Sequence, residues 1–229
     1  MDLSMKMLLV AFIACLLAGI LPAEESWPQF RGPGGSATAP KGARIPVEWG
    51  EDKNLKWKTA IPGPGSSSPV FTGNRLFVTC YTGYGTSPEE VGSARDLGRQ
   101  LLCLDRSDGR ILWKKSIELA NPEDPYRGYL MEHGYASSTP VTDGRNVYVF
   151  TGKSGLHAFT VEGRRLWTKG VGKKSSNRRW GSAASPVLYR DLIIINAADE
   201  ARQLIAFDKK SGEEKWRYGS GELELAFAT

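Results

Sequence analysis

Short apolar runs alternate with polar turns along most of the chain, and this pattern predicts an all-β protein. Dipeptides such as Asp143-Gly144 and Ser211-Gly212 separate the runs. Glycine in such turns supplies the positive φ angles that tight hairpins need. The 229 residues include 26 glycines and 13 prolines, so turns are frequent. We therefore expect many short antiparallel strands.

The apolar runs recur as a repeat with three copies. Each copy ends in glycine, three further residues and tryptophan, at 109–113, 163–167 and 212–216. Each begins with a small residue, proline and valine, at 68–70, 139–141 and 185–187. Two apolar runs lie between these signals, so a copy holds four short strands, the number in a β-propeller blade. The repeat predicts blades at about 66–115, 136–169 and 183–217.

One tryptophan recurs at a fixed position in each copy. A large apolar side chain that repeats in this way is best explained as a wedge against the neighbouring blade. A fourth tryptophan ends residues 54–57, which we interpret as an isolated outermost strand that completes the last blade of a closed ring. The four structural blade tryptophans are Trp57, Trp113, Trp167 and Trp216.

The order Ser/Thr-x-Pro-Val, two apolar strands, Ala-x-Asp and Ser-Gly-x-x-x-Trp resembles the PQQ-like (pyrroloquinoline quinone-type) β-propeller repeat, over roughly residues 55–218. That repeat occurs in quinoprotein dehydrogenases and in non-catalytic outer-membrane assembly lipoproteins of the BamB type. Residues 27–33, Trp-Pro-Gln-Phe-Arg-Gly-Pro, are similar to the start of secreted PQQ-like proteins of planctomycete-type bacteria. The resemblance implies a propeller of four-stranded antiparallel blades, commonly eight in a ring.

Three blades are fewer than a closed propeller uses. Residues 225–229 resemble the approach to another copy, so we expect a segment of a larger ring. A short protein that closes its ring as a homo-oligomer is the alternative.

Residues 1–23 resemble a secretory signal peptide, with Lys6, an apolar stretch and Ala23 before polar residues. The mature chain is then periplasmic or secreted, without a transmembrane domain, and residues 24–54 form a polar arm. A lipoprotein signal at Cys15 and an uncleaved anchor helix are alternatives. Apolar residues continue past Cys15, however, and the stretch is a little short to span a bilayer.

Composition and charge narrow the partners only slightly. A hydrophobic content of 41% and a charged content of 24% are those of a globular chain, and the net charge of +5 is mild. Within 164–179, seven bases occur without an acid, which suits an anionic polymer, lipid headgroups or an acidic protein partner. Nucleic acid is not expected, because an exported chain without a reading element is in the wrong compartment. A solvated loop is the alternative. The seven bases are Arg164, Arg165, Lys169, Lys173, Lys174, Arg178 and Arg179.

Few residues suggest a site. His133 precedes the first strand of the second blade, and Arg179 and Trp180 precede the first strand of the third, positions that face the central channel of a propeller. They are candidates for binding a planar anionic ligand, although each could also be structural. No catalytic residue and no metal-ligand spacing is evident. The resemblance to quinoproteins implies calcium ligands, an aspartate base and often a vicinal cysteine pair, and this chain has no adjacent cysteines.

Cys80 and Cys103 fall in the first blade on neighbouring strands. A tight-hairpin register pairs Cys80 with Leu101 and Cys103 with Val78, so the cysteines would be diagonal neighbours on one face, near the limit for a disulfide. A free Cys103 that fills the place of a small core alanine is the alternative. The first blade also carries an insertion between Thr82 and Gln100, interpreted as a solvated flap.

These features predict an exported binding or outer-membrane-assembly scaffold. They favour an enzyme less, and no cofactor is assignable from them. A quinoprotein-like alcohol or sugar dehydrogenase, with PQQ and calcium, is the first alternative. A polysaccharide-binding module is the second.

Overall fold

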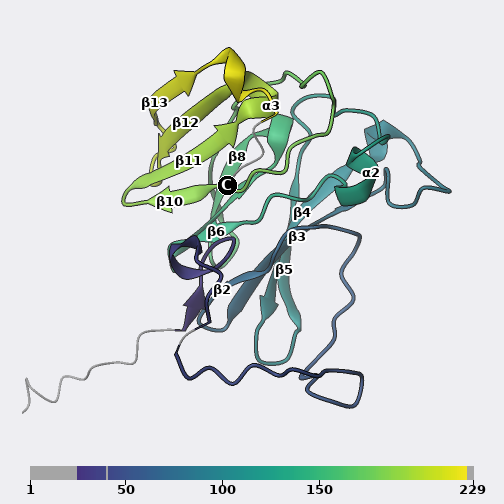
Figure 1. The fold of residues 1–229 in the computed structure, drawn as a ribbon, viewed down its shortest axis with the longest axis vertical. Helices are drawn as coiled ribbons and strands as arrows, with labels where there is room; N and C mark the ends of the chain where they lie inside the picture. Colours follow the sequence, from purple (N-terminus) through teal and green to yellow (C-terminus); the bar gives the residue numbers. More distant parts are fainter. Residues whose placement is uncertain (1–24, 40, 226–229) are drawn as a thin grey trace, which may run out of the picture.

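The computed structural model describes residues 25–39 and 41–225, so the predicted signal peptide lies outside the described residues. Three antiparallel sheets follow one another along the chain (Figure 1), each with its strands in sequence order. The strands of the three sheets are β2 (Val70–Thr72), β3 (Arg75–Thr82), β4 (Gly98–Asp105) and β5 (Ile111–Ile117); β6 (Val141–Thr142), β7 (Asn146–Phe150), β8 (Leu156–Thr160) and β9 (Arg165–Lys169); β10 (Val187–Tyr189), β11 (Leu192–Ala197), β12 (Gln203–Asp208) and β13 (Glu214–Gly219).

These sheets are propeller blades. Their innermost strands β2, β6 and β10 lie beside one another in that order, and within the described residues the sheets do not close into a ring. Apolar side chains fill the spaces between blades. Phe77 and Leu101 meet Val149 between the first and second blades, and Tyr148 meets Ile193 between the second and third. The predicted all-β propeller fold is confirmed.

Each blade is locked to the next by a tryptophan that lies on a glycine turn. The Nε1 of Trp113 donates a hydrogen bond to Val161 O over 3.1 Å, and that of Trp167 donates to Lys209 O over 3.3 Å. A Cβ atom on Gly163 would lie 2.9 Å from the Trp113 ring, and one on Gly212 would lie 2.7 Å from the Trp167 ring. Both glycines have positive φ angles, so the turn and the contact each require glycine.

Trp57 makes the same contact with the first blade. Its Nε1 donates to Arg106 O over 2.9 Å, and its ring lies against Gly109. Residues 54–57 are not a strand, so that part of the prediction is wrong. Among the described residues no neighbouring strand pairs with this segment, and the tryptophan contact alone does not create a β-ladder.

The beginning of the described chain crosses the inner edges of the blades. β1 (Ser26–Trp27) pairs with β2, and Thr142 N of the second blade donates to Pro28 O over 2.8 Å. The following turn, which includes η1 (Pro33–Gly35), lines a space of about 270 Å³ together with Pro186 of the third blade. The predicted polar arm therefore contains a short strand, and its first part bonds to the inner strands of the first two blades and faces the third across this space.

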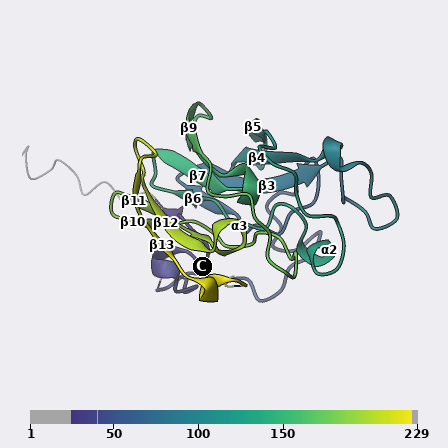
Figure 2. The same cartoon turned by 90° about the horizontal axis from the view of Figure 1, so that it is seen from above.

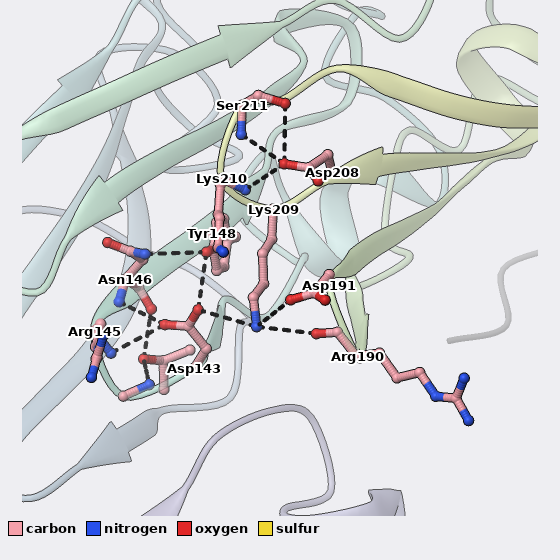
Figure 3. A network of polar contacts seen from close by, with 12 residues as sticks. Asp143, Arg145, Asn146, Tyr148, Arg190, Asp191, Asp208, Lys209, Lys210 and Ser211 are labelled. Carbon is pink, nitrogen blue, oxygen red and sulfur yellow. Dashed lines mark hydrogen bonds and ion pairs between the residues drawn. The ribbon is translucent and has the colours of Figure 1, made fainter.

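A polar cluster joins the second and third blades at the turn ends of their strands (Figure 3). The Nζ of Lys209 lies 3.8 Å from Asp143 Oδ2 and 3.7 Å from Asp191 Oδ1, and it donates to Arg190 O over 3.1 Å. Tyr148 OH also donates to Asp143 Oδ2, over 3.2 Å. The backbone carbonyl oxygen of the same Lys209 accepts the hydrogen bond from the Trp167 indole. The tryptophan contact and the ion pairs therefore hold the same turn of the third blade in place.

Cys80 and Cys103 are both buried and free. The observed register pairs Cys80 with Gln100 and Cys103 with Phe77, one residue away from the predicted pairing. Because side chains alternate across a strand, this shift puts the two thiols on opposite faces of the sheet. Cys103 packs with Phe77, and Cys80 packs with Leu102. The bridged alternative is therefore excluded in this fold.

Trp167→Ala should lower the free energy of unfolding by about 3 kcal/mol, because it removes a wedge that packs into the core between two blades. Trp216→Ala, at the same repeat position, should cost less than about 1 kcal/mol, since Trp216 is 40% exposed. Urea unfolding of both variants checks the difference. Equal losses would show that the tryptophans do not act as wedges.

Alkylation under denaturing conditions should label Cys80 and Cys103 fully, whether or not the protein is first reduced. In the native protein both thiols should react slowly, because burial raises the pKa of Cys80 and raises that of Cys103 to about 11. Peptide mapping by mass spectrometry checks both statements. A peptide pair linked by a disulfide would contradict the observed register.

Candidate functional site

The connections between blades collect at one end of the sheets, here called the loop face. In four-stranded antiparallel blades, the connection from the second to the third strand and the connection to the next blade leave from the same end. The helices α2 (Leu130–His133) and α3 (Ala198–Ala201) lie in these connections. In both views they lie away from the hairpin that joins β4 to β5 (Figure 1, Figure 2).

An open groove of about 500 Å³ lies on the loop face, lined by Tyr129, His133, Trp180 and Ala183. We call it the aromatic groove. The centroids of the Tyr129 and Trp180 rings are 5.2 Å apart and the rings are tilted by 46°, while Tyr129 and His133 are 5.9 Å apart. Tyr129 and His133 come from the connection between β5 and β6, and Trp180 comes from the connection between β9 and β10. The groove therefore forms only where two blades meet.

His133 ties these two connections together. Its Nε2 lies 2.8 Å from Trp180 O, and its Nδ1 lies 2.6 Å from Ser137 Oγ. A carbonyl oxygen only accepts hydrogen bonds, so Nε2 is the donor to Trp180 O. Both ring nitrogens are engaged within the protein. His133 thus positions Trp180, and neither nitrogen is turned toward a ligand as a base.

The sequence candidates are brought together only in part. His133 and Trp180 meet in the groove, whereas Arg179 stands beside it in a left-handed conformation with φ 53°. The guanidinium that reaches the Trp180 ring belongs to Arg178, with Cζ 5.8 Å from the ring centroid. Sequence reasoning named Arg178 only as one of the seven bases and missed Tyr129. Tyr129 lies far from Trp180 in sequence, and no spacing rule connects them.

A buried ionic network supports the two connections from below. Arg99 Nη1 pairs with Glu123 Oε1 over 2.8 Å, and Lys153 Nζ pairs with Asp124 Oδ2 over 3.1 Å. Ser175 Oγ accepts from Lys153 Nζ and donates to Asp124 Oδ1, each over 2.8 Å. Buried charges are tolerated only when they are paired and hydrogen-bonded, so these contacts strongly constrain the loops. They join the first two blades to the segment that carries Trp180.

The third blade is attached to the same segment through α3. Ser176 N donates to Asp199 Oδ1 over 2.9 Å, and Lys174 N donates to Glu200 O over 2.9 Å. The Glu200 side chain is almost fully buried, and this burial raises its pKa to about 7. Space for it exists because Gly152 has no side chain, and a Cβ there would lie 3.1 Å from Glu200 Oε1.

The insertion of the first blade is a packed support. Tyr84 stacks near Tyr126 and Tyr135, at ring distances of 6.4 Å and 5.7 Å, and its hydroxyl accepts from Tyr126 N. The same cluster includes the buried Leu130 of α2. The interpretation of the whole insertion as a solvated flap is therefore wrong for this part. Its Tyr84 is the sequence signal for this packing, since a tyrosine provides apolar area and a hydroxyl that needs a partner.

The seven bases of 164–179 do not form one patch. Arg164 and Arg165 lie at the turn between β8 and β9, at the end of the blade away from the loop face, and β9 separates them from the rest. Lys169 is half-buried at the end of β9, and four exposed bases remain on the loop face, in the segment that carries Trp180. They are Lys173, Lys174, Arg178 and Arg179.

Three further features bear on what the described residues can do. Across residues 25–39 and 41–225 no group of three or more His, Cys, Asp or Glu side chains is placed to hold a metal ion. His157 is buried in the second blade between Thr151 and Thr168, and burial lowers its pKa to about 4. In the same ranges no helix has the length and apolar character needed to cross a bilayer.

Fold and site together define a propeller-repeat protein with an aromatic groove on its loop face. The sequence model of the family described as outer membrane protein assembly factor BamB matches residues 98–228, more than half of the chain. The chain therefore belongs to this family, which confirms the resemblance seen in the repeats. No curated protein matches the sequence.

Three solved structures illustrate the similarity. BamB from Moraxella catarrhalis is 15% identical with a TM-score of 0.45, covering 72% of this chain and 39% of its own. The quinohemoprotein alcohol dehydrogenase from Comamonas testosteroni is 16% identical with a TM-score of 0.42, covering 68% and 21%. The computationally designed Ika4 protein is 12% identical with a TM-score of 0.47, covering 76% and 84%. The chain thus spans about two fifths of the length of this BamB.

The described residues do not fit a quinoprotein cofactor site. The groove offers an aromatic ring with a guanidinium beside it, but it has neither a set of calcium ligands nor a vicinal cysteine pair. Glu123 and Asp124, in the network below the groove, are used in buried ion pairs with Arg99 and Lys153.

Glu200→Gln should remove a pH dependence of stability. The folded pKa of Glu200, about 7, lies above its ordinary value of 4.5, so the folded state binds a proton that the unfolded state releases. Wild-type stability should therefore fall between pH 5 and pH 8, by about 3 kcal/mol from this group. Urea unfolding at the two pH values should show the fall to be smaller in Glu200→Gln than in wild type or in the exposed-site control Glu222→Gln. An unchanged fall would contradict the assignment.

Proposed function

We propose that this protein is an exported binding scaffold of the assembly-factor kind, which holds a macromolecular partner in its aromatic groove without transforming it. Export is supported by the signal-like residues 1–23 and by the name of the family. The partner is either a protein, as an assembly factor requires, or an anionic polymer.

The observation that carries the proposal is the use of His133. The imidazole of His133 has both nitrogens committed to Ser137 and Trp180, so it maintains the shape of the groove. The remaining lining side chains, Tyr129, Trp180 and Ala183, provide mainly aromatic contact area. A rigid aromatic surface with few titratable groups is typical of recognition.

The foundation of the groove also favours binding. Buried ion pairs and the tyrosine cluster hold both connections, so the rings are presented in one arrangement before a partner arrives. Preorganisation of this kind reduces the entropy lost on association.

A photo-reactive amino acid in place of Tyr129 should form a discrete adduct in the producing cells, because this side chain is 59% exposed in the groove. The same amino acid in place of Tyr189, which is 54% exposed at the far end of β10, should form none. Gel shift and mass spectrometry of the adduct read out the result. Adducts from both positions would indicate random collision and contradict a groove-specific partner.

The quinoprotein alternative is tested by adding PQQ and calcium to the purified protein and following dye reduction with alcohols and sugars. The scaffold proposal predicts no substrate-dependent reduction. Substrate-dependent dye reduction by the wild-type protein that is lost in Trp180→Ala would overturn the scaffold proposal.

A further inference from the structure

We infer that the aromatic groove and the bases beside it bind an acidic polysaccharide, in which uronic-acid carboxylates accompany a chain of sugar rings. The inference rests on the proposed function, since it names the chemical class that the scaffold holds. The rings of Tyr129 and Trp180 would pack against the sugars, and Arg178 would pair with a carboxylate.

The groove has the surfaces that a sugar ring needs. Tyr129 and Trp180 are tilted by 46° with respect to each other, so they form two walls of an open trough. Aromatic faces pack well against the C–H face of a pyranose, through apolar area and weak C–H contacts. Ala183 is the remaining small lining residue, and a volume of about 500 Å³ lies in the range of small-ligand sites. One or two sugar rings can therefore enter.

The charge beside the groove selects an anionic ligand. Lys173, Lys174, Arg178 and Arg179 are exposed in one connection, and no acid lies between 170 and 180. Arg178 is held over the Trp180 ring, where its guanidinium can form a paired hydrogen bond with a carboxylate next to a stacked sugar. Of the neighbouring acids, Glu224 is paired with Arg202 over 3.0 Å, and Glu132 of α2 is exposed. The net charge of the side chains beside the groove is therefore positive.

The backbone at the groove favours a saccharide over an extended peptide. A peptide that adds to a sheet needs a free strand edge with open N–H and C=O groups. Three carbonyl oxygens at the groove already accept hydrogen bonds within the protein. Tyr129 O accepts from Glu132 N, Leu130 O accepts from Gly134 N, and Trp180 O accepts from His133. The groove therefore presents rings and guanidinium groups, and few main-chain partners.

The test measures the binding of the full chain to polygalacturonate by calorimetry or affinity electrophoresis. Dextran serves as the neutral polysaccharide and poly-glutamate as the anionic polymer without sugars. Polygalacturonate should bind at least about tenfold more tightly than either, because only it engages both the rings and the bases.

Variants assign the contacts. Tyr129→Ala should weaken binding about tenfold and Tyr129→Phe only slightly, while Arg178→Gln should weaken it several-fold and reduce its salt dependence. Two controls match them elsewhere: Tyr189→Ala, which removes an exposed tyrosine with Arg190 5.2 Å from its ring, and Arg164→Gln, at the far end of β9. Both controls should bind like wild type. Thermal unfolding verifies that each variant is folded.

Equal binding of dextran or of poly-glutamate would overturn the inference, as would equal losses in the controls. If an acidic, aromatic-rich peptide binds with the same Tyr129 dependence and polygalacturonate does not, the ligand class is wrong and the scaffold stands. Turnover with PQQ would instead remove the scaffold proposal itself.

Discussion

The contact between a tryptophan and the glycine turn of the next blade is the constraint on which this structure depends. It couples a large apolar ring, one indole hydrogen bond and a backbone conformation that favours glycine at a single point. Trp113 and Trp167 each make this contact between two blades, and Trp57 makes it with the first blade from a segment outside the sheets. A repeat architecture of this kind gains its stability from nearest-neighbour interfaces.

The loop face follows from that stacking. Once the blades are aligned, the connections between them come within reach of one another, and long-range polar contacts fix their shape. Arg99 reaches from β4 to Glu123, and Lys153 reaches from the second blade to Asp124 and Ser175. Such pairs contribute little net stability when buried, but a misplaced partner would leave an unpaired charge. They therefore select one arrangement of the groove above them.

Much of the fold could be predicted from the sequence because the repeat is local. Glycine, tryptophan and proline-valine recur at short distances along the chain. Glycine indicates a turn, tryptophan the contact with the next blade, and proline-valine the start of a strand. The cysteine register failed because the insertion before Gly98 removed the tight hairpin on which it depended. Whether β1 forms, and whether residues 54–57 form a strand, depends on which sheet edges are free to pair. The sequence of a single segment does not show this.

The site was predictable only in part, for the same reason. His133 and Trp180 could be proposed from their position before inner strands. Tyr129 and Arg178 become important only through contacts across two connections, and the split of the basic segment by β9 required knowing where that strand runs. The candidate site depends on contacts between blades, whereas the repeat describes what lies within a blade.

Hydrogen exchange of the full chain with and without polygalacturonate tests the central claim most directly, because it locates the ligand without altering the protein. The account predicts slower exchange in residues 129–137 and 173–184, and unchanged exchange in β13 and in the turn at 162–165. Protection at that turn or along β13, with none at the groove, would contradict it.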